Sequence, residues 1–140
     1  MRLFLDANIL FSAAYRDGSP ALLLFDLAAV GRCHLVTSGL AWEEARRNIA
    51  IKCPQRLPIL DDLVGRLEYA PVPDASAIAH AVEQGLPDKD VPILAAAGVA
   101  QAQILVTGDR AHLGHLYGKA IGNLCVLTLR DTLGRLVEPS

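Results

Sequence analysis

The sequence has little net charge and no long apolar run. The net charge is −2, which excludes the general basic surface of many nucleic-acid-binding proteins. A polyanionic partner would therefore require local basic residues or a metal ion. No apolar run approaches the roughly 18 residues of a transmembrane helix. The apolar start of the chain is interrupted by Asp6 and Asn8, which is not typical of a secretory signal peptide.

Cysteine is also scarce. Cys33, Cys53 and Cys125 are odd in number, and none belongs to a C-x-x-C pair. This pattern favours three reduced thiols in a cytoplasmic protein, packed as small apolar residues. No histidine pair or cysteine cluster has the spacing of zinc ligands. The histidines are therefore interpreted as ordinary polar or packing residues, although His112 stands out because it lies close to Asp109 in the sequence.

Apolar residues make up 52% of the 140-residue chain and charged residues 20%, which is typical of one globular domain spanning residues 1–140. Short apolar segments alternate with helical ones. Strands are expected at residues 3–5, 34–37, 104–106 and 124–127, and helices at 21–30, 40–51, 55–67, 75–84, 91–102 and 129–136, with Ser19, Asp74 and Thr128 as helix caps. Residues 68–73 are expected to form an extended connector. The alternation predicts a three-layer α/β/α sandwich with a mostly parallel central sheet.

Two aspartates directly follow predicted strands. Asp6 follows Leu3-Phe4-Leu5, and Asp109 follows Ile104-Leu105-Val106 after Thr107-Gly108. Because parallel strands end at a common edge of the sheet, where α/β proteins place their chemistry, the two carboxylates are expected to lie near each other. Each aspartate is also consistent with an ordinary turn or helix cap.

Further acids flank predicted helices. Glu43 can pair with Arg47 on a solvated helix face, whereas Glu44, about 100° further around the helix, is expected to face inward. Asp88 and Asp90 precede the alanine-rich helix, where acids also suit the helix dipole. Four acids at one sheet edge would repel one another unless a hard divalent cation were present. Mg²⁺ or Mn²⁺ held there would activate water and neutralise a phosphodiester.

The arrangement of these motifs resembles the PIN domain, a family of metal-dependent ribonucleases that includes VapC-type toxins. The matching segments are Leu3 to Leu10 with Asp6 and Asn8, Thr37-Ser38 with Glu44, Asp90 with Ile93 to Ala97, and Leu105 to Asp109. The resemblance implies an acidic metal site of Asp6, Glu44, Asp90 and Asp109, supported by Asn8, Thr107 and Ser38. Arg110-Ala111-His112 stands where many members carry a further acid, so a second metal site is expected to be weak or absent.

The resemblance implies a Mg²⁺- or Mn²⁺-dependent endoribonuclease that is the toxin of a toxin–antitoxin pair, with an antitoxin partner and a homodimeric state. Hydrolysis would leave a 3′-hydroxyl and a 5′-phosphate. Arg46, Arg47 and Arg110 are candidates for phosphate contacts, or for surface solubility. Trp42 would stack on a base or belong to the core.

Two other functions fit parts of the pattern. One is a catalytically weak RNA-binding module, which four intact acids disfavour. The other is a phosphotransferase of the haloacid dehalogenase type, which needs a general acid at the position that Asn8 occupies.

Overall fold

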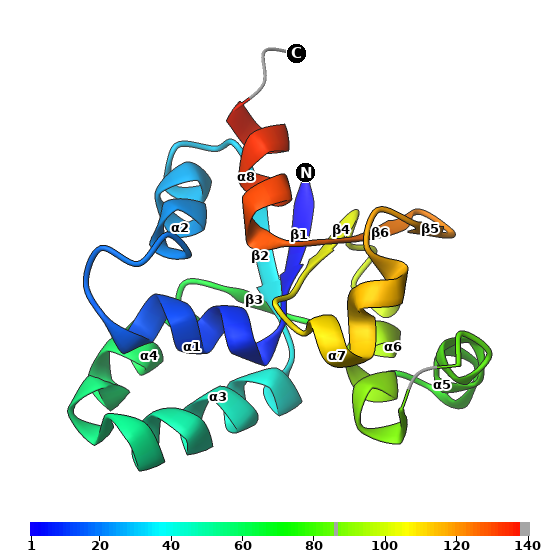
Figure 1. The fold of residues 1–140 in the computed structure, drawn as a ribbon, viewed down its shortest axis with the longest axis horizontal. Helices are drawn as coiled ribbons and strands as arrows, with labels where there is room; N and C mark the ends of the chain where they lie inside the picture. Colours follow the sequence, from blue (N-terminus) through cyan, green and yellow to red (C-terminus); the bar gives the residue numbers. More distant parts are fainter. Residues whose placement is uncertain (86, 138–140) are drawn as a thin grey trace.

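The computed structural model describes residues 1–85 and 87–137 (Figure 1). The side chain of His112, singled out above, lies outside this description. The described residues form one six-stranded sheet in the order β3-β2-β1-β4-β6-β5. Its strands are β1 (Arg2–Leu5), β2 (His34–Thr37), β3 (Glu68–Tyr69), β4 (Ile104–Val106), β5 (Ala120–Ile121) and β6 (Leu124–Leu127). Only the β5–β6 pair is antiparallel among them.

Helices cover both faces of the sheet. Side chains alternate between the two faces along each strand, and apolar side chains on both faces are buried by helices. Leu3 and Leu5 of β1 are buried on one face and Phe4 on the other. The first face packs against α1 (Ala7–Tyr15), α2 (Leu22–Ala29), α3 (Gly39–Lys52), α4 (Leu57–Val64) and α8 (Leu129–Val137). The second packs against α5 (Ala75–Val82), α6 (Val91–Val99) and α7 (Arg110–Leu113). The three-layer α/β prediction is confirmed.

Helix caps explain several boundaries. The Asp74 carboxylate accepts the Ala77 N–H at 2.9 Å, and the Thr128 hydroxyl accepts the Asp131 N–H at 3.1 Å, as predicted. Ser19 does not cap α2. Residues 20 and 21 form a turn first, and Ala21 is the capping residue, without a side-chain hydrogen bond. No helix within residues 1–85 and 87–137 is long and apolar enough to cross a membrane.

Other helices are shorter than the sequence predicts. The helix expected at 55–67 is a 3-10 turn (Pro54–Arg56) followed by α4, because Pro58 lacks an N–H and fits only in the first turn of a new helix. Helix α6 ends at Val99, and nearby Gln101 adopts a left-handed φ of 56°. The sequence motifs gave no assignment for α1, α7 and β5.

Candidate active site

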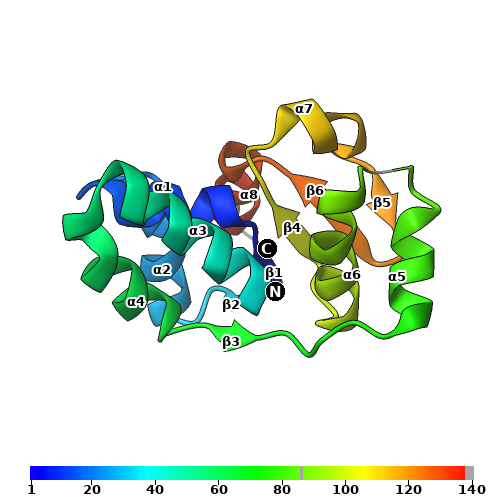
Figure 2. The same ribbon diagram turned by 90° about the horizontal axis from the view of Figure 1, so that it is seen from below.

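The candidate site lies where β1, β2 and β4 end. Figure 1 shows β1 running away from the N-terminus, so Figure 2 views the molecule from the side of these strand ends. The register places Leu5 of β1 opposite Val106 of β4. Asp6 follows the first of these residues and Thr107 the second. The parallel pairing therefore brings the segments after β1 and β4 together, as the sequence predicts.

Asp6 is held in place by three hydrogen bonds. Its Oδ1 accepts the Ala7 N–H at 2.7 Å, which caps α1. Its Oδ2 accepts the Thr107 hydroxyl at 2.7 Å and the Asn8 amide Nδ2 at 3.2 Å. Only 6% of the residue is exposed. Asp6 is thus both a helix cap and a fixed carboxylate at the sheet edge, so the two interpretations of this residue are compatible.

The electrostatic environment of Asp6 disfavours its negative charge. Burial raises the pKa of its carboxyl above the ordinary value, although the Thr107 and Ala7 hydrogen bonds oppose this effect. The negative charges of Glu44 and Asp90 raise the pKa further. The structure therefore brings Glu44 of α3 and Asp90, which directly precedes α6 (Val91–Val99), into electrostatic reach of Asp6. A cation among these carboxylates would relieve both the repulsion and the cost of burial.

Asn8 and Thr107 form a brace between the segments that follow β1 and β4. The Asn8 Oδ1 accepts the Gly108 N–H at 2.7 Å, and its Nδ2 donates to the Thr107 Oγ1 at 3.2 Å. The Thr107 Oγ1 also accepts the Asp109 N–H at 3.1 Å. Through this brace, the backbone position of half-buried Asp109 is tied to that of Asp6.

Tyr117 is a component of the site that the motifs did not reveal. Its hydroxyl donates to the Thr107 carbonyl oxygen at 3.0 Å. Burial raises the pKa of this hydroxyl, Arg110 lowers it, and the Asp109 and Asp6 charges raise it further. The ring therefore lies close to the acidic residues. It belongs to a segment for which the sequence predicted no element, so no periodicity or spacing identified it.

The helix carrying the glutamates begins at Ser38, whose Oγ accepts the Ala41 N–H at 3.1 Å. Ser38 thus orients α3, and its contact to the site is indirect. The charge of Glu44 raises the pKa of Asp6. This electrostatic effect favours Glu44 as the second acid. Its side chain is exposed, like that of Glu43, so the expectation that Glu44 faces inward is not met.

Asp88 and Asp90 belong to a 3-10 turn (Asp88–Asp90) before α6. Asp88 is exposed, whereas Asp90 is half-buried. Within the described part of the chain, no three carboxylate, imidazole or thiol groups converge closely enough to ligate one ion. The four acids predicted from the sequence therefore share one sheet edge without forming a single closed cage.

The arginines and the tryptophan considered as RNA contacts differ in exposure and in their partners. Arg46 pairs with Asp61 of α4 at 3.3 Å, so its guanidinium is engaged by an acid outside the predicted site. Arg47 and Arg110 are exposed. Trp42 packs against the hydrophobic core, and its buried indole Nε1 has no hydrogen-bond partner among the described residues. Trp42 is therefore a packing residue in this structure, not an exposed stacking surface.

Comparisons with known proteins place this geometry in a family. The family model described as the PIN domain matches residues 2–111. The chain therefore belongs to the PIN domain family. No curated protein matches the sequence.

Solved structures share the fold at low identity. VapBC2 from Rickettsia felis, bound to a DNA fragment from its promoter, is 21% identical with a TM-score of 0.67, covering 91% of this chain and 98% of that chain. VapBC-1 from nontypeable Haemophilus influenzae is 18% identical with a TM-score of 0.62, covering 93% and 99%. Mycobacterium tuberculosis VapC20, a sarcin-ricin loop cleaving toxin, is 13% identical with a TM-score of 0.57, covering 84% and 96%.

Proposed function

We propose that the protein is a divalent-metal-dependent endoribonuclease and the toxin of a toxin–antitoxin pair. The observation that carries this proposal is the buried, triply hydrogen-bonded Asp6 in electrostatic reach of Glu44 and Asp90, at the strand ends of a PIN domain. Clustered carboxylates at a sheet edge serve no packing purpose. Their mutual repulsion is a cost that a bound cation removes.

The donor set fits Mg²⁺ or Mn²⁺. All the candidate ligands are hard carboxylate oxygens, and Asp6 already faces other negative charges. Mg²⁺ keeps several water molecules and commonly uses only one or two protein carboxylates together with substrate phosphates. A site in which no three described protein ligands converge is compatible with this coordination preference. We propose Asp6 and Asp109, joined through the Thr107 brace, as direct ligands, and Glu44 and Asp90 as outer partners.

A bound divalent ion would supply water activation and neutralisation of the phosphodiester charge. The residues of the chain hold the proposed metal ligands in position. Thr107 and Asn8 fix the Asp6 carboxylate, and the Asp109 backbone is fixed by the same hydroxyl. Exposed Arg110, close to Tyr117, would contact a backbone phosphate. Water would attack phosphorus in line, and the bond to O3′ would break, leaving a 3′-hydroxyl and a 5′-phosphate.

The partners are part of the proposal. Similar folds occur in VapBC complexes and in the toxin VapC20, which supports an antitoxin as partner. We further propose RNA as the substrate and a homodimeric, cytoplasmic protein. A phosphotransferase of the haloacid dehalogenase type is not favoured. Its general acid would have to be Asn8, and the Asn8 amide is occupied by Asp6, Thr107 and Gly108.

The proposal is tested by incubating the purified protein with structured and unstructured RNA in Mg²⁺, Mn²⁺ or excess EDTA. We expect cleavage of unstructured RNA with either metal, and loss of cleavage in EDTA. RNA binding without cleavage under every metal condition would instead favour the catalytically weak binding module.

A further inference from the structure

Two neighbouring helices lead away from the candidate active site. Helix α1 begins directly after Asp6, and α3 carries Glu44 in its first half. The helices lie side by side in both ribbon views. Their shared outer surface therefore starts at the carboxylates and continues along the molecule.

An aromatic pair lies on this surface. Phe11 and Tyr15 are four residues apart on α1, and their rings stack with centroids 5.2 Å apart and planes inclined by 26°. Asn8, the brace residue, lies on the same helix face, because residues three, four and seven positions apart align in a helix. Tyr15 is 45% exposed. An exposed aromatic ring in line with the site offers a face for a nucleobase.

Positive charge accompanies the aromatic pair. The Lys52 ammonium of α3 lies 5.2 Å from the centroid of the Phe11 ring. Lys52 has no carboxylate within 4.0 Å among the described residues. The acid at the far end of α1, Asp17, is paired with Arg56 at 2.9 Å.

We infer that a single RNA strand leaves the active site along this surface, which we define by Phe11, Tyr15 and Lys52 and name the α1–α3 track. The inference rests on the proposed function, because it assigns a path to the same substrate. Aromatic rings accompanied by a cation without a counter-ion are a pattern with which proteins hold single strands. A protein partner is less well matched, because the Lys52 ammonium would have to be desolvated in such an interface without a counter-ion from this chain.

The length of the track predicts how much RNA it holds. Tyr15 lies nine residues after Asp6, which corresponds to about 13 Å along the helix axis. At roughly 3.4 Å per stacked nucleotide, this distance spans about four nucleotides. An oligonucleotide of three nucleotides centred on the scissile bond would not reach Tyr15, whereas a twelve-nucleotide strand would.

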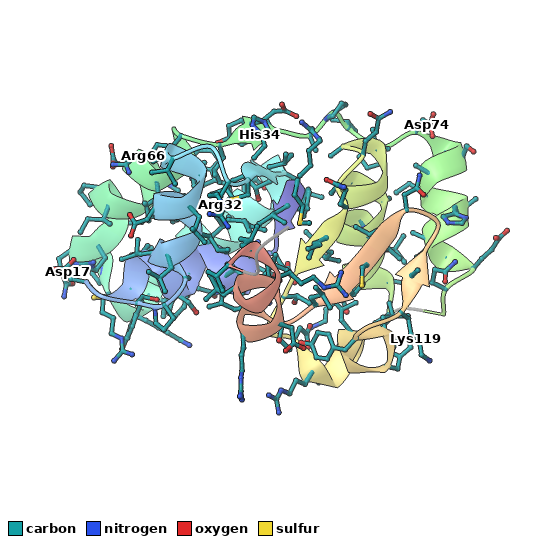
Figure 3. All side chains as sticks on the ribbon, turned by 90° about the horizontal axis from the view of Figure 1, so that it is seen from above. Asp17, Arg32, His34, Arg66, Asp74 and Lys119 are labelled. Atoms are coloured by element: carbon teal, nitrogen blue, oxygen red, sulfur yellow. The ribbon has the colours of Figure 1, made fainter. Side chains whose placement is uncertain are left out.

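The test measures fluorescence anisotropy of labelled three- and twelve-nucleotide RNAs with the full-length Asp6→Asn protein in Mg²⁺. The second changes are Tyr15→Leu and Lys52→Gln, with Tyr15→Phe as the conservative variant. Controls are Tyr69→Leu, at the edge strand β3, and Lys119→Gln, which Figure 3 places near β5. We expect Tyr15→Leu and Lys52→Gln each to weaken binding of the twelve-nucleotide RNA about fivefold or more.

The same two changes should alter binding of the three-nucleotide RNA less than twofold, and the controls and Tyr15→Phe should bind both RNAs like the parent. Unchanged binding of the long RNA would overturn the inference, as would an equal loss for both RNAs. Loss of binding to a partner protein with RNA binding intact would assign the track to that partner instead.

Cleavage by otherwise wild-type protein is measured separately. Length-dependent binding through Tyr15 without any cleavage would refute the proposed nuclease and keep the track. Cleavage without that dependence would keep the nuclease and refute the track.

Discussion

Replacement of Asp6 by asparagine separates the proposed metal ligand from an ordinary helix cap. The side chain keeps its shape, and one amide oxygen can still accept the Ala7 N–H that caps α1. Asparagine is, however, a poor ligand for a hard cation. If Asp6 positions the metal, we expect cleavage to fall roughly a thousandfold or more, which corresponds to about 4 kcal/mol of transition-state stabilisation.

The effect of this change on stability follows from opposing contributions. The amide removes a buried negative charge that Glu44 and Asp90 repel, an effect on the order of 1 kcal/mol at an effective dielectric constant of about 20. The new NH₂ group would face the Asn8 Nδ2, which now donates to Asp6 Oδ2. Loss of a hydrogen bond to a charged group costs about 1.5–3 kcal/mol. Without metal, we therefore expect a change in unfolding free energy within about 2 kcal/mol of zero.

The response of stability to metal and to pH distinguishes the wild type from the Asp6→Asn variant more sharply than their stability under one condition. The pKa of Asp6 is raised in the folded state. The folded state therefore favours the protonated carboxyl, and its contribution to stability is complete at pH values below the unfolded pKa near 4. This contribution is lost as pH rises through the higher folded value. In EDTA, the wild type should therefore lose stability relative to the Asn variant as pH rises through this window. Saturating Mg²⁺ should restore the wild type above that window and leave the variant unchanged.

The assay is thermal unfolding of both proteins from pH 4 to 8, with EDTA and with Mg²⁺, beside RNA cleavage. A variant that retains activity would refute the assignment of Asp6 as central ligand. A wild-type midpoint that does not respond to saturating metal would refute it equally.

The remaining predictions concern the partners of Asp6. Glu44→Gln should reduce cleavage far more than Glu43→Gln, because the Glu44 charge acts on Asp6; equal losses in initial rate would show that α3 presents both. Tyr117→Phe removes the hydrogen bond to the Thr107 carbonyl and should lower kcat about fivefold, the equivalent of about 1 kcal/mol, with KM unchanged; a loss confined to KM would assign the ring to RNA binding. The protein should be a homodimer by light scattering at about 20 μM, and a monomer mass there would contradict an interface of micromolar affinity.

Strong local patterns made much of the fold predictable. The apolar runs at β1, β2, β4 and β6 were identified because strands buried on both faces are nearly continuous apolar segments. The same runs located Asp6 and Asp109 at strand ends. Helix α1 was missed because its sequence carries no separate start signal. Its cap, Asp6, is also the site carboxylate, and the strand runs into the helix without a loop.

The connections within the site could not be predicted. The hydrogen bonds of Asn8 and Tyr117 to the Thr107 segment join residues separated by 99 and 10 positions, and no periodicity encodes such pairs. The choice between Glu43 and Glu44 depended on helix phase, which sequence spacing suggested and the position of α3 favours. Trp42 was ambiguous because an amphipathic ring suits a core or a binding surface equally well.

The most direct test of the central claim is metal titration of RNA cleavage by wild-type protein and the Asp6→Asn variant after exhaustive EDTA treatment. We predict that wild-type cleavage is absent in EDTA, returns on addition of Mg²⁺ or Mn²⁺, and leaves 5′-phosphate ends. The variant should remain inactive at every metal concentration that restores the wild type. Undiminished wild-type cleavage in EDTA, or full recovery of the variant with metal, would contradict an Asp6-centred metal nuclease.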